Sequence, residues 1–564
     1  MKKDKEKNVE KKKNKKGKLK KHININVNFT IVAIILIAIF CVCVTPVTFQ
    51  NDTYYTIKIG ELIKNNGIDM MDHFSWHENL SYTYPHWLYD FFTYLIYSIV
   101  GFKGVYIITC VLSAILGISI FLVNSKLTKS KSISFIITMG VIYALKPYIA
   151  ARAQLVTFIL FIWELFFIEK FIENRKIGYG IGLILISTLI ANLHVATWPF
   201  FFVLFLPYIG EYLIAIVSDI IIYKKCKMLV IKHKMKKAQK KNDIERLKEL
   251  QIKLQEQEDK NLKIKDKREN KNNSYKLVIK RKENVKFLII IMIICAFTGL
   301  LTPLGDTPYT YLYKTMKGNT TQNISEHLPL TLINNTNAMC VLVIFLAILI
   351  FTKTKIRLSD LFMLSGLCYL MFSTRRQFSI FVLICSVILT KFIVDLINTY
   401  TKKGIKEFEE AFRNVLVVIS LTVLIGLMSY DAAKPKLDDK FVDSKSYPVE
   451  ACDYILENID LSKARFYNEY NYGSYMLFRG IPVFIDSRAD LYAPEFSGNK
   501  DEDIFTDFIN TSSVSKFYED TFNELVPEVL EDALKENKIE AVSRPDIDVK
   551  QIGKGQDLIF TAVF

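Results

Sequence analysis

Cysteine and glycine are scarce in this chain, which has only 9 Cys and 22 Gly among 564 residues. Such a composition excludes a secreted disulfide scaffold and a collagenous chain. Eight of the cysteines lie in apolar segments or, as Cys226, in a basic loop. Only Cys452 lies in the acidic C-terminal region, which therefore cannot form an internal disulfide. We interpret the cysteines as small buried hydrophobic residues, because none shows metal-site spacing.

Apolar and aromatic residues are abundant instead. The chain is 51% hydrophobic, contains 40 Phe and 29 Tyr, and has a mean hydropathy of +0.21. Many apolar runs of 16 to 24 residues are separated by short polar breaks, and a helix of that length crosses a bilayer. This pattern excludes a wholly disordered chain and predicts a mainly α-helical, polytopic membrane protein.

The net charge of +16 is confined to two segments. Residues 1–22 carry 12 Lys against 3 acids, and residues 223–286 carry 23 Lys or Arg against 9 acids. Residues 431–564, by contrast, hold 27 acids against 15 bases. Basic segments of membrane proteins stay on the cytoplasmic side, where they also meet anionic lipid. Neither basic segment has stacking aromatics or a nucleic-acid-binding motif, so we expect no nucleic-acid partner.

The topology follows from charge. We expect a cytoplasmic tail over 1–27, an uncleaved first span at about 28–47 and a first outer loop over 48–103. Within that loop, the aromatic segment 87–101 is either an interfacial helix or a short span. An interfacial helix keeps the basic loops at 126–131, 173–176, 353–357 and 401–406 inside, whereas a span would place them outside. Charge counting therefore favours the interfacial helix.

About eleven spans are predicted in total. After 28–47 and 104–123 they fall near 133–148, 153–171, 177–193, 200–222, 287–303, 338–352, 359–373, 378–395 and 414–430. We divide the chain into an N-terminal membrane module (28–222), a charged cytoplasmic insert (223–286), further membrane helices (287–430) and an outer domain (431–564). An odd number of spans places the outer domain outside a plasma membrane, with the N-terminus in the cytoplasm.

The two regions outside the membrane differ in pattern. The insert has helical spacing with apolar residues at 244, 247, 250 and 254, which favours a solvated helical hairpin over a short coiled coil. The outer domain alternates helical segments with expected strands at 464–470, 473–480, 481–488 and 557–564. We therefore expect an α/β domain of ordinary size.

Ionisable residues cluster in the outward segments. They are Asp52, Glu61, Asp72, His73, His86, Arg152, His194, Glu326, His327, Arg375 and Arg376. Taken singly, each has a structural explanation: Asp52 marks a span boundary, His194 is a satisfied interfacial histidine, and the arginines are outer anchors. Together, acids, imidazoles and arginines at one bilayer face suit general-base or metal chemistry on a phosphate-bearing lipid. Arginine binds phosphate through forked hydrogen bonds.

The order of several motifs resembles the GT-C superfamily, which comprises polytopic glycosyltransferases that take a sugar from a polyprenyl-phosphate carrier. More closely, it resembles bacterial members with a C-terminal outer domain. The matching segments are NDTYYTIKIGELI (51–63), DHFSWHENLSYTYPHWLYD (72–90), ARAQL (151–155), ANLHVA (191–196), LTPLG (301–305), ISEHLPL (324–330), STRRQF (373–378) and NEYNYGSYMLFRGIPVFIDSRADLY (468–492).

The resemblance implies roles for individual residues. Asp52 would be the general base or a metal ligand, and the second acid would be Glu61, Asp69 or Asp72. Arg152, Arg375 and Arg376 would neutralise the leaving polyprenyl phosphate. Sugar and acceptor binding would fall to His73, His86, His194, Glu326, His327, Asp486, Arg488 and Asp490, of which the last three form a salt-linked turn in the alternative interpretation.

The reaction implied is an inverting sugar transfer to a cell-surface glycan, lipid or protein. The need for a divalent cation such as Mg²⁺ or Mn²⁺ is left open, as are the sugar, the acceptor and the oligomeric state. One alternative is a transporter of lipid-linked intermediates, which would use ionisable groups deep in the spans; here these are few, with Glu164 and Glu211 as exceptions. Another is a non-catalytic membrane scaffold.

Overall fold

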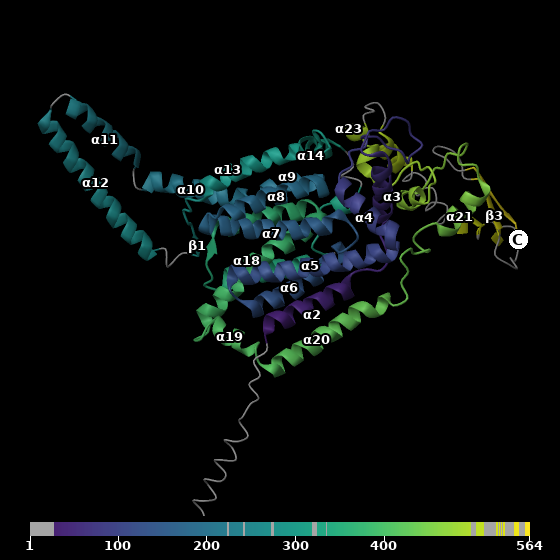
Figure 1. Cartoon of the computed structure of the whole chain (residues 1–564), viewed down its shortest axis with the longest axis horizontal. Coiled ribbons are helices and arrows are strands. Elements are labelled where there is room, and N and C mark those ends of the chain that lie inside the picture. Colours follow the sequence, from purple (N-terminus) through teal and green to yellow (C-terminus); the bar gives the residue numbers. More distant parts are fainter. Residues whose placement is uncertain are drawn as a thin grey trace, which may run out of the picture.

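The structure is a computed structural model. It describes residues 28–222, 225–240, 243–271, 276–318, 324–333, 335–497, 503–511, 526–527, 529–530, 532, 534–535, 546–551 and 559–563. The tail 1–27 and most of 498–564 thus lie outside the described residues. The molecule is a helical bundle with a charged hairpin at one end and a layer of loops and short helices at the other (Figure 1).

Long apolar helices run side by side to form the bundle (Figure 1). They are α2 (Phe29–Val44), α5 (Phe102–Thr128), α6 (Lys131–Leu145), α7 (Ala153–Asn174), α8 (Ile177–Leu193), α9 (Trp198–Val203), α10 (Leu206–Ile222), α13 (Val285–Ala296), α16 (Thr336–Phe351), α17 (Leu358–Ser373), α18 (Phe378–Tyr400) and α20 (Val415–Ala433). Every expected apolar segment thus overlaps a helix, with α9 and α10 sharing one. Within the described residues, four helical stretches are long and apolar enough to cross a membrane, and five shorter ones are also apolar. The count of eleven spans stays a prediction.

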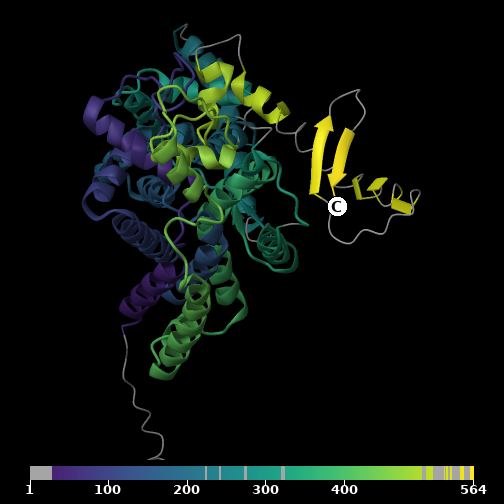
Figure 2. The ribbon, with the colours of Figure 1, turned by 90° about the vertical axis from the view of Figure 1, so that its right-hand side faces the viewer.

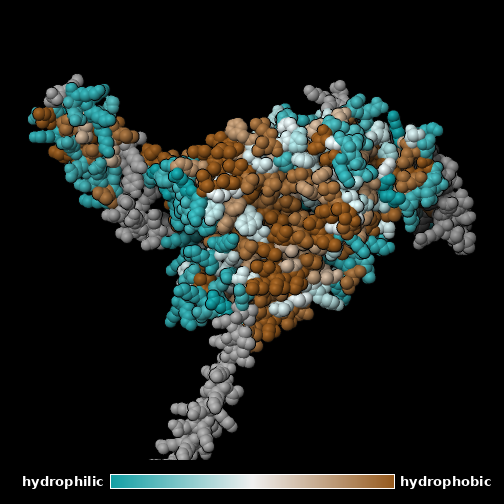
Figure 3. All heavy atoms as spheres, in the orientation of Figure 1, coloured by the Kyte–Doolittle hydropathy of each residue, from teal (hydrophilic) through white to brown (hydrophobic). Residues whose placement is uncertain are grey.

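The bundle also exposes apolar side chains on its outside. On α2, Ile31, Ile35 and Ile39 are about half exposed, and on α20 Leu427 is 63% exposed. Such residues form a hydrophobic belt between two hydrophilic ends (Figure 3). A belt of this kind is stable in contact with lipid and unfavourable in water, so the chain is that of a membrane protein.

At one end of the bundle lie α11 (Lys225–Lys240), α12 (Ile244–Lys271) and α19 (Ile405–Ala411). The hairpin of α11 and α12 is held by Ile231, Ala238 and Leu250. Near it, β1 (Leu277–Val278) pairs in parallel with β2 (Ile356–Arg357).

Glu164 and Glu211, the two acidic residues singled out in the sequence, lie within bundle helices. Glu211 of α10 accepts hydrogen bonds from Arg357 Nε at 2.8 Å and from the Lys280 amide at 2.9 Å. Glu164 of α7 is fully buried, and neither of its carboxyl oxygens has a hydrogen-bond partner.

At the opposite end, a second hydrophobic core forms the outer layer. Its helices are α3 (Asn51–Asn66), α4 (Trp87–Val100), α14 (Thr307–Lys317), α21 (Val449–Asn458), α22 (Tyr470–Phe478) and α23 (Pro494–Ser497). Tyr54 of α3 lies edge-on to Tyr447 and Tyr475, with ring centroids 5.0 and 5.2 Å away. The first outer loop and the outer domain therefore share one core.

Three of the four strands expected in the outer domain fall on described residues that are not strands. Residues 464–469 are irregular, 470–478 form α22, and 481–488 contribute only an isolated bridge from Val483 to Ser75. The 470–478 segment is helical instead and packs on α3, where Tyr475 and Leu477 are buried. The described strands of this domain are β3 (Asp546–Gln551) and β4 (Ile559–Val563), which pair antiparallel (Figure 2). The strand expected at 557–564 is thus confirmed over β4.

Two glycines permit close backbone approaches in the outer layer. A Cβ at Gly60 would lie 2.1 Å from the carbonyl oxygen of Asp90, so glycine lets α3 press on α4. A Cβ at Gly473 would lie 1.9 Å from the carbonyl oxygen of Ile485. These contacts place α3 and the 485–488 turn, which both carry candidate site residues.

Candidate functional site

Asp52, Arg152 and Glu326 form a line of ion pairs in the outer layer. Asp52 lies in the first turn of α3, where an acid is favoured by the helix dipole, and its Oδ2 is paired with Arg152. Arg152 precedes α7 and also contacts Glu326 Oε1 at 3.2 Å. Burial alone would lower the pKa of Arg152, but Asp52 and Glu326 raise it above its usual value. Three predicted residues from distant segments thus meet.

The outer domain completes this line through Ser487. The Ser487 hydroxyl donates a hydrogen bond to Asp52 Oδ1 at 2.9 Å, and its amide donates to Ser474 Oγ at 3.2 Å. The side chain of Asp52 remains 20% exposed. Asp52 is therefore oriented by partners on both sides and is still open to a small group.

His86 and His194 lie together next to this line. Their ring centroids are 5.6 Å apart, and His194 Nδ1 shares a hydrogen bond with Thr157 Oγ1 at 2.9 Å. His86 Nδ1 lies 3.4 Å from Oδ2 of the fully buried Asp90. Burial lowers the pKa of His194 well below its usual value, with smaller contributions from His86, Arg376 and Arg152. Burial likewise raises the pKa of Asp90.

Arg375 and Arg376 begin the turn before α18. This short 3-10 helix, η5 (Arg375–Gln377), is fixed by the Arg375 amide, which donates to Leu328 O at 2.9 Å. Burial first, and then Arg376, lowers the pKa of His327, and Arg376 also contributes to the lowered pKa of His194. Arg376 is thus close enough to act electrostatically on both imidazoles.

Asp72, Asp486 and Arg488 lie together in the interface of the outer domain. Arg488 contacts Asp72 Oδ1 and Asp486 Oδ2, each at 2.7 Å, and its side chain is 3% exposed. Burial would raise the pKa of Asp72, but Arg488 and hydrogen bonds from Ser75 lower it. All three side chains are covered, so the geometry suits a salt-linked turn joining the domain to the first outer loop. Asp490, nearby, accepts a hydrogen bond from Tyr311.

Glu61 and His73 are not brought to Asp52. Glu61 pairs with Lys58 at 2.8 Å on the surface of α3, and nine helical residues separate it from Asp52 by about 13 Å and half a turn. His73 Nε2 lies 2.6 Å from Asp69 Oδ2 with both side chains well exposed.

Buried polar atoms without partners gather in this layer. They include Asn51 Oδ1, Tyr82 Oη, Trp87 Nε1, Asp90 Oδ1, Arg152 Nε and Gln377 Oε1. Most buried polar atoms of a folded chain are hydrogen-bonded, so such a group is typical of a site that a polar ligand or water completes. A cavity of about 660 Å³ also opens between the first outer loop, α14 and α23, with Tyr82, Thr307, Glu495 and Phe496 among its walls.

The described residues around Asp52 do not form a cluster of metal ligands. Asp52 already faces the Arg152 guanidinium, and the described residues include no group of three or more His, Cys, Asp or Glu that could hold a metal ion.

One family model matches the chain, that of the bacterial trigger factor protein, over residues 508–564. Similar proteins include the trigger factor of Lachnoclostridium phytofermentans, 53% identical over 49 residues, or 9% of this chain and 11% of that protein. Another is the trigger factor of Limosilactobacillus reuteri, which is 32% identical over 81 residues, or 14% of this chain and 18% of that protein. The chain thus spans less than a fifth of these relatives. The family match concerns the last part of the outer domain, including β3 and β4, and excludes the ion-paired site.

The solved structures that are similar to this chain include two of one protein. Both are of the Archaeoglobus fulgidus oligosaccharyltransferase, one tethered to an acceptor peptide and one in the apo form. Each has a TM-score of 0.47 and 10% sequence identity, and covers 81% of this chain and 64% of that chain. The transferase activity and the acceptor peptide belong to those proteins, and neither structure assigns an activity to this chain.

Sequence reasoning missed Ser487, Asp90 and Thr157 as site residues. Ser487 lies inside the motif DSRAD, in which only the charged residues were predicted as site residues. Asp90 was assigned to an aromatic interfacial helix, although an acid within an apolar helix is itself a signal. Thr157 carries no such signal, because a threonine in an apolar helix commonly bonds its own backbone.

Proposed function

We propose that this protein is a GT-C-type membrane glycosyltransferase. It would transfer a sugar from a polyprenyl-phosphate donor to a glycan, lipid or protein acceptor at the outer face of the plasma membrane. The observation that carries the proposal is the line of ion pairs formed by Asp52, Arg152 and Glu326 at the end of an apolar bundle. Ser487 adds a hydrogen bond to Asp52. A partly exposed carboxylate fixed beside arginine suits proton transfer next to a phosphate.

In the proposed reaction, Asp52 accepts the proton of the acceptor hydroxyl. The acceptor oxygen attacks the anomeric carbon as the bond from that carbon to the phosphate oxygen breaks, and the electron pair leaves with the polyprenyl phosphate. A single displacement inverts the anomeric centre. Arg152, Arg375 and Arg376 stabilise the negative charge that gathers on the leaving phosphate.

The histidines and Glu326 would shape the sugar pocket. His194 is buried with a lowered pKa, so it would serve as a neutral hydrogen-bonding group. The 660 Å³ cavity offers hydroxyl, carboxylate and aromatic side chains, a combination suited to binding a sugar. Tyr55 lies near both the site and the cavity wall, because Asp52 and Tyr82 add to the effect of burial in raising its pKa.

The test compares cells expressing wild type, Asp52→Asn and Glu78→Gln, in which an exposed acid of the same loop loses its charge. Mass spectrometry of polyprenyl-linked sugars and released surface glycans is the readout. We expect Asp52→Asn to accumulate one lipid-linked sugar and to lose one glycan residue, while Glu78→Gln matches wild type. Unchanged profiles in Asp52→Asn cells, at normal protein level, would refute catalysis and favour the scaffold.

One observation favours a transporter instead. Glu164 is buried in α7 without a hydrogen-bond partner for either oxygen, and an ionisable group inside a membrane helix is typical of a transport path. If the protein moves lipid-linked intermediates, Glu164→Gln should abolish movement across the membrane while Asp52→Asn spares it. If the protein is a transferase, Asp52→Asn should alter the glycan profile more than Glu164→Gln does.

A further inference from the structure

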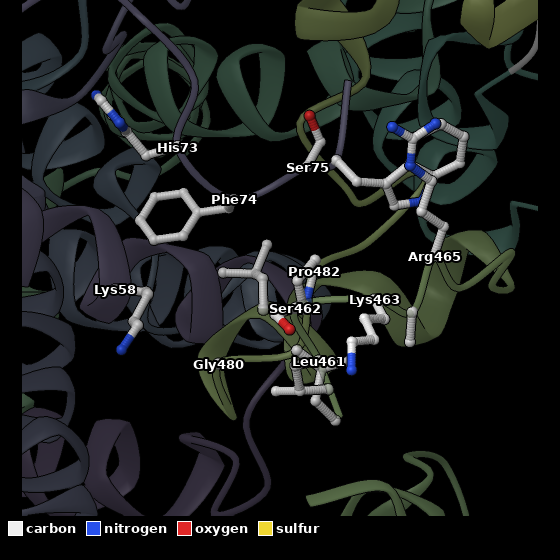
Figure 4. Close-up of a pocket in the computed structure, with 14 residues that line it drawn as sticks. Lys58, His73, Phe74, Ser75, Leu461, Ser462, Lys463, Arg465, Gly480 and Pro482 are labelled. Carbon is white, nitrogen blue, oxygen red and sulfur yellow. The ribbon is translucent and has the colours of Figure 1, made fainter. Parts of the chain in front are cut away.

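A second cavity lies away from the ion-paired line, between the first outer loop and the outer domain. Its volume is about 340 Å³. One wall is formed by residues 73–76 and by Lys58 of α3, and the other by 461–465 and 480–482 (Figure 4). Both parts of the outer layer thus contribute to it, and a bound group would contact both.

The lining of this cavity is basic. It includes Lys58, His73, Lys463 and Arg465, and none of its 14 lining residues is an acid. The surrounding outer domain, residues 431–564, carries a net charge of −12, from 27 acids and 15 bases. A cationic cavity beside an acidic domain is not explained by overall composition, and its basic side chains create a local positive potential.

The four basic groups differ in how far they are neutralised. Lys58 is paired with Glu61 at 2.8 Å, and His73 faces Asp69. Lys463 lies 3.2 Å from Asp460 but is 84% exposed, so this pair contributes little. Arg465 is in no ion pair among the described residues; instead, its guanidinium carbon lies 5.2 Å from the ring centroid of Trp76.

The stacking of Arg465 on Trp76 favours an anionic ligand. A guanidinium that lies over an aromatic ring is held by its face, which leaves the N–H groups at its edge available for hydrogen bonds. Those N–H groups match the spacing of phosphate or carboxylate oxygens. Trp76 is itself fixed, since its Nε1 donates to Phe466 O at 3.0 Å.

We propose that this cavity is a binding site for an anionic group of the phosphate or carboxylate type, held by Arg465, Lys463 and Lys58. Lys58 lies six residues after Asp52 on α3, which is about 9 Å along the helix. If the proposed transfer function holds, the anionic group would belong to an acceptor whose hydroxyl reaches Asp52. The binding itself needs no turnover, so it can be tested separately from the transfer.

The experiment uses the full chain, purified in a neutral detergent. Glucose 6-phosphate and glucuronate are the anionic probes, and glucose is the neutral control. Binding is followed by tryptophan emission and by calorimetry; Trp76→Phe identifies the cavity signal among the four tryptophans. The key variant is Arg465→Gln with Lys463→Gln, and Lys445→Gln removes an exposed charge of the same domain outside the cavity.

We expect saturable binding of at least one anionic probe, weakened by added salt, and none of glucose. The double variant should bind at least tenfold more weakly, with an unchanged thermal transition because both side chains are exposed, while Lys445→Gln binds normally. Equal affinity in the double variant, or no binding of either anion, would overturn the proposal. The anionic probes are also titrated in nanodiscs. Weaker probe binding in phosphatidylglycerol than in phosphatidylcholine would show that the lipid competes and would assign the site to a lipid headgroup. Equal probe binding in the two lipids would assign the site to a soluble anion.

Discussion

The hydroxyl of Ser487 donates a hydrogen bond to Asp52 across a separation of 435 residues. Asp52 lies at the start of α3, just after the first bundle helix, whereas Ser487 lies in the outer domain. The outer domain therefore contributes directly to the surroundings of the proposed general base, and deleting it would alter the site as well as remove a surface.

Ser487→Ala tests this relationship. A hydrogen bond to a charged group contributes about 1.5–3 kcal/mol, so we expect kcat of the sugar transfer to fall by roughly tenfold or more with little change in KM. Transfer assays on membranes, with the donor identified from Asp52→Asn cells, supply the measurement. Ser446→Ala, which removes an exposed hydroxyl bonded to Asp443, should keep wild-type kcat. Equal kcat in both variants would remove Ser487 from the mechanism.

Arg488→Met should detach the outer domain from the first outer loop. Removing one partner leaves Asp72 and Asp486 buried without a counter-charge, which costs about 3–5 kcal/mol. Limited proteolysis and the thermal transition in detergent would show the loss. As a control, Lys403→Gln breaks an exposed pair with Glu407 and should leave both unchanged. A stable, protease-resistant Arg488→Met protein would contradict the structural role.

Gly60→Ala should displace α3 from α4, because the new Cβ would meet the Asp90 carbonyl oxygen at 2.1 Å. Overpacking of this kind costs about 1–3 kcal/mol, and Asp52 on the same helix would move, so we expect lower transfer activity as well. Gly140→Ala places a Cβ where no atom lies within 4 Å and should keep wild-type activity and stability. Normal activity of Gly60→Ala would show that the helix contact can relax.

Stability should fall with acidification partly because of His194. Its pKa is lowered in the folded protein, so below about pH 6.5, the usual value of histidine, the unfolded chain binds a proton that the folded chain does not. The free energy of unfolding therefore rises with pH up to that value, by at most about 1.4 kcal/mol per pH unit. Denaturation curves between pH 5 and 7 should show that the free energy of unfolding depends less on pH in His194→Gln than in wild type. An unchanged slope would mean that His194 is protonated alike in both states.

Part of the site could be predicted from the sequence because its signals are local. The acid after the first apolar run and the arginines at helix starts stand out against their neighbours, and Asp52, Arg152 and Glu326 do meet. Glu61 showed the limit of such reasoning: it shares α3 with Asp52, yet helical geometry turns it to another face, where Lys58 neutralises it.

The sequence by itself determined the bundle and the distribution of charge. Apolar runs of membrane-crossing length form helices wherever they occur, since the backbone can satisfy its hydrogen bonds within each helix. Only the tertiary structure decided that 470–478 is helical, that Arg488 is buried between Asp72 and Asp486, and that Ser487 reaches Asp52. These outcomes depend on contacts between segments hundreds of residues apart, and no local periodicity encodes such contacts.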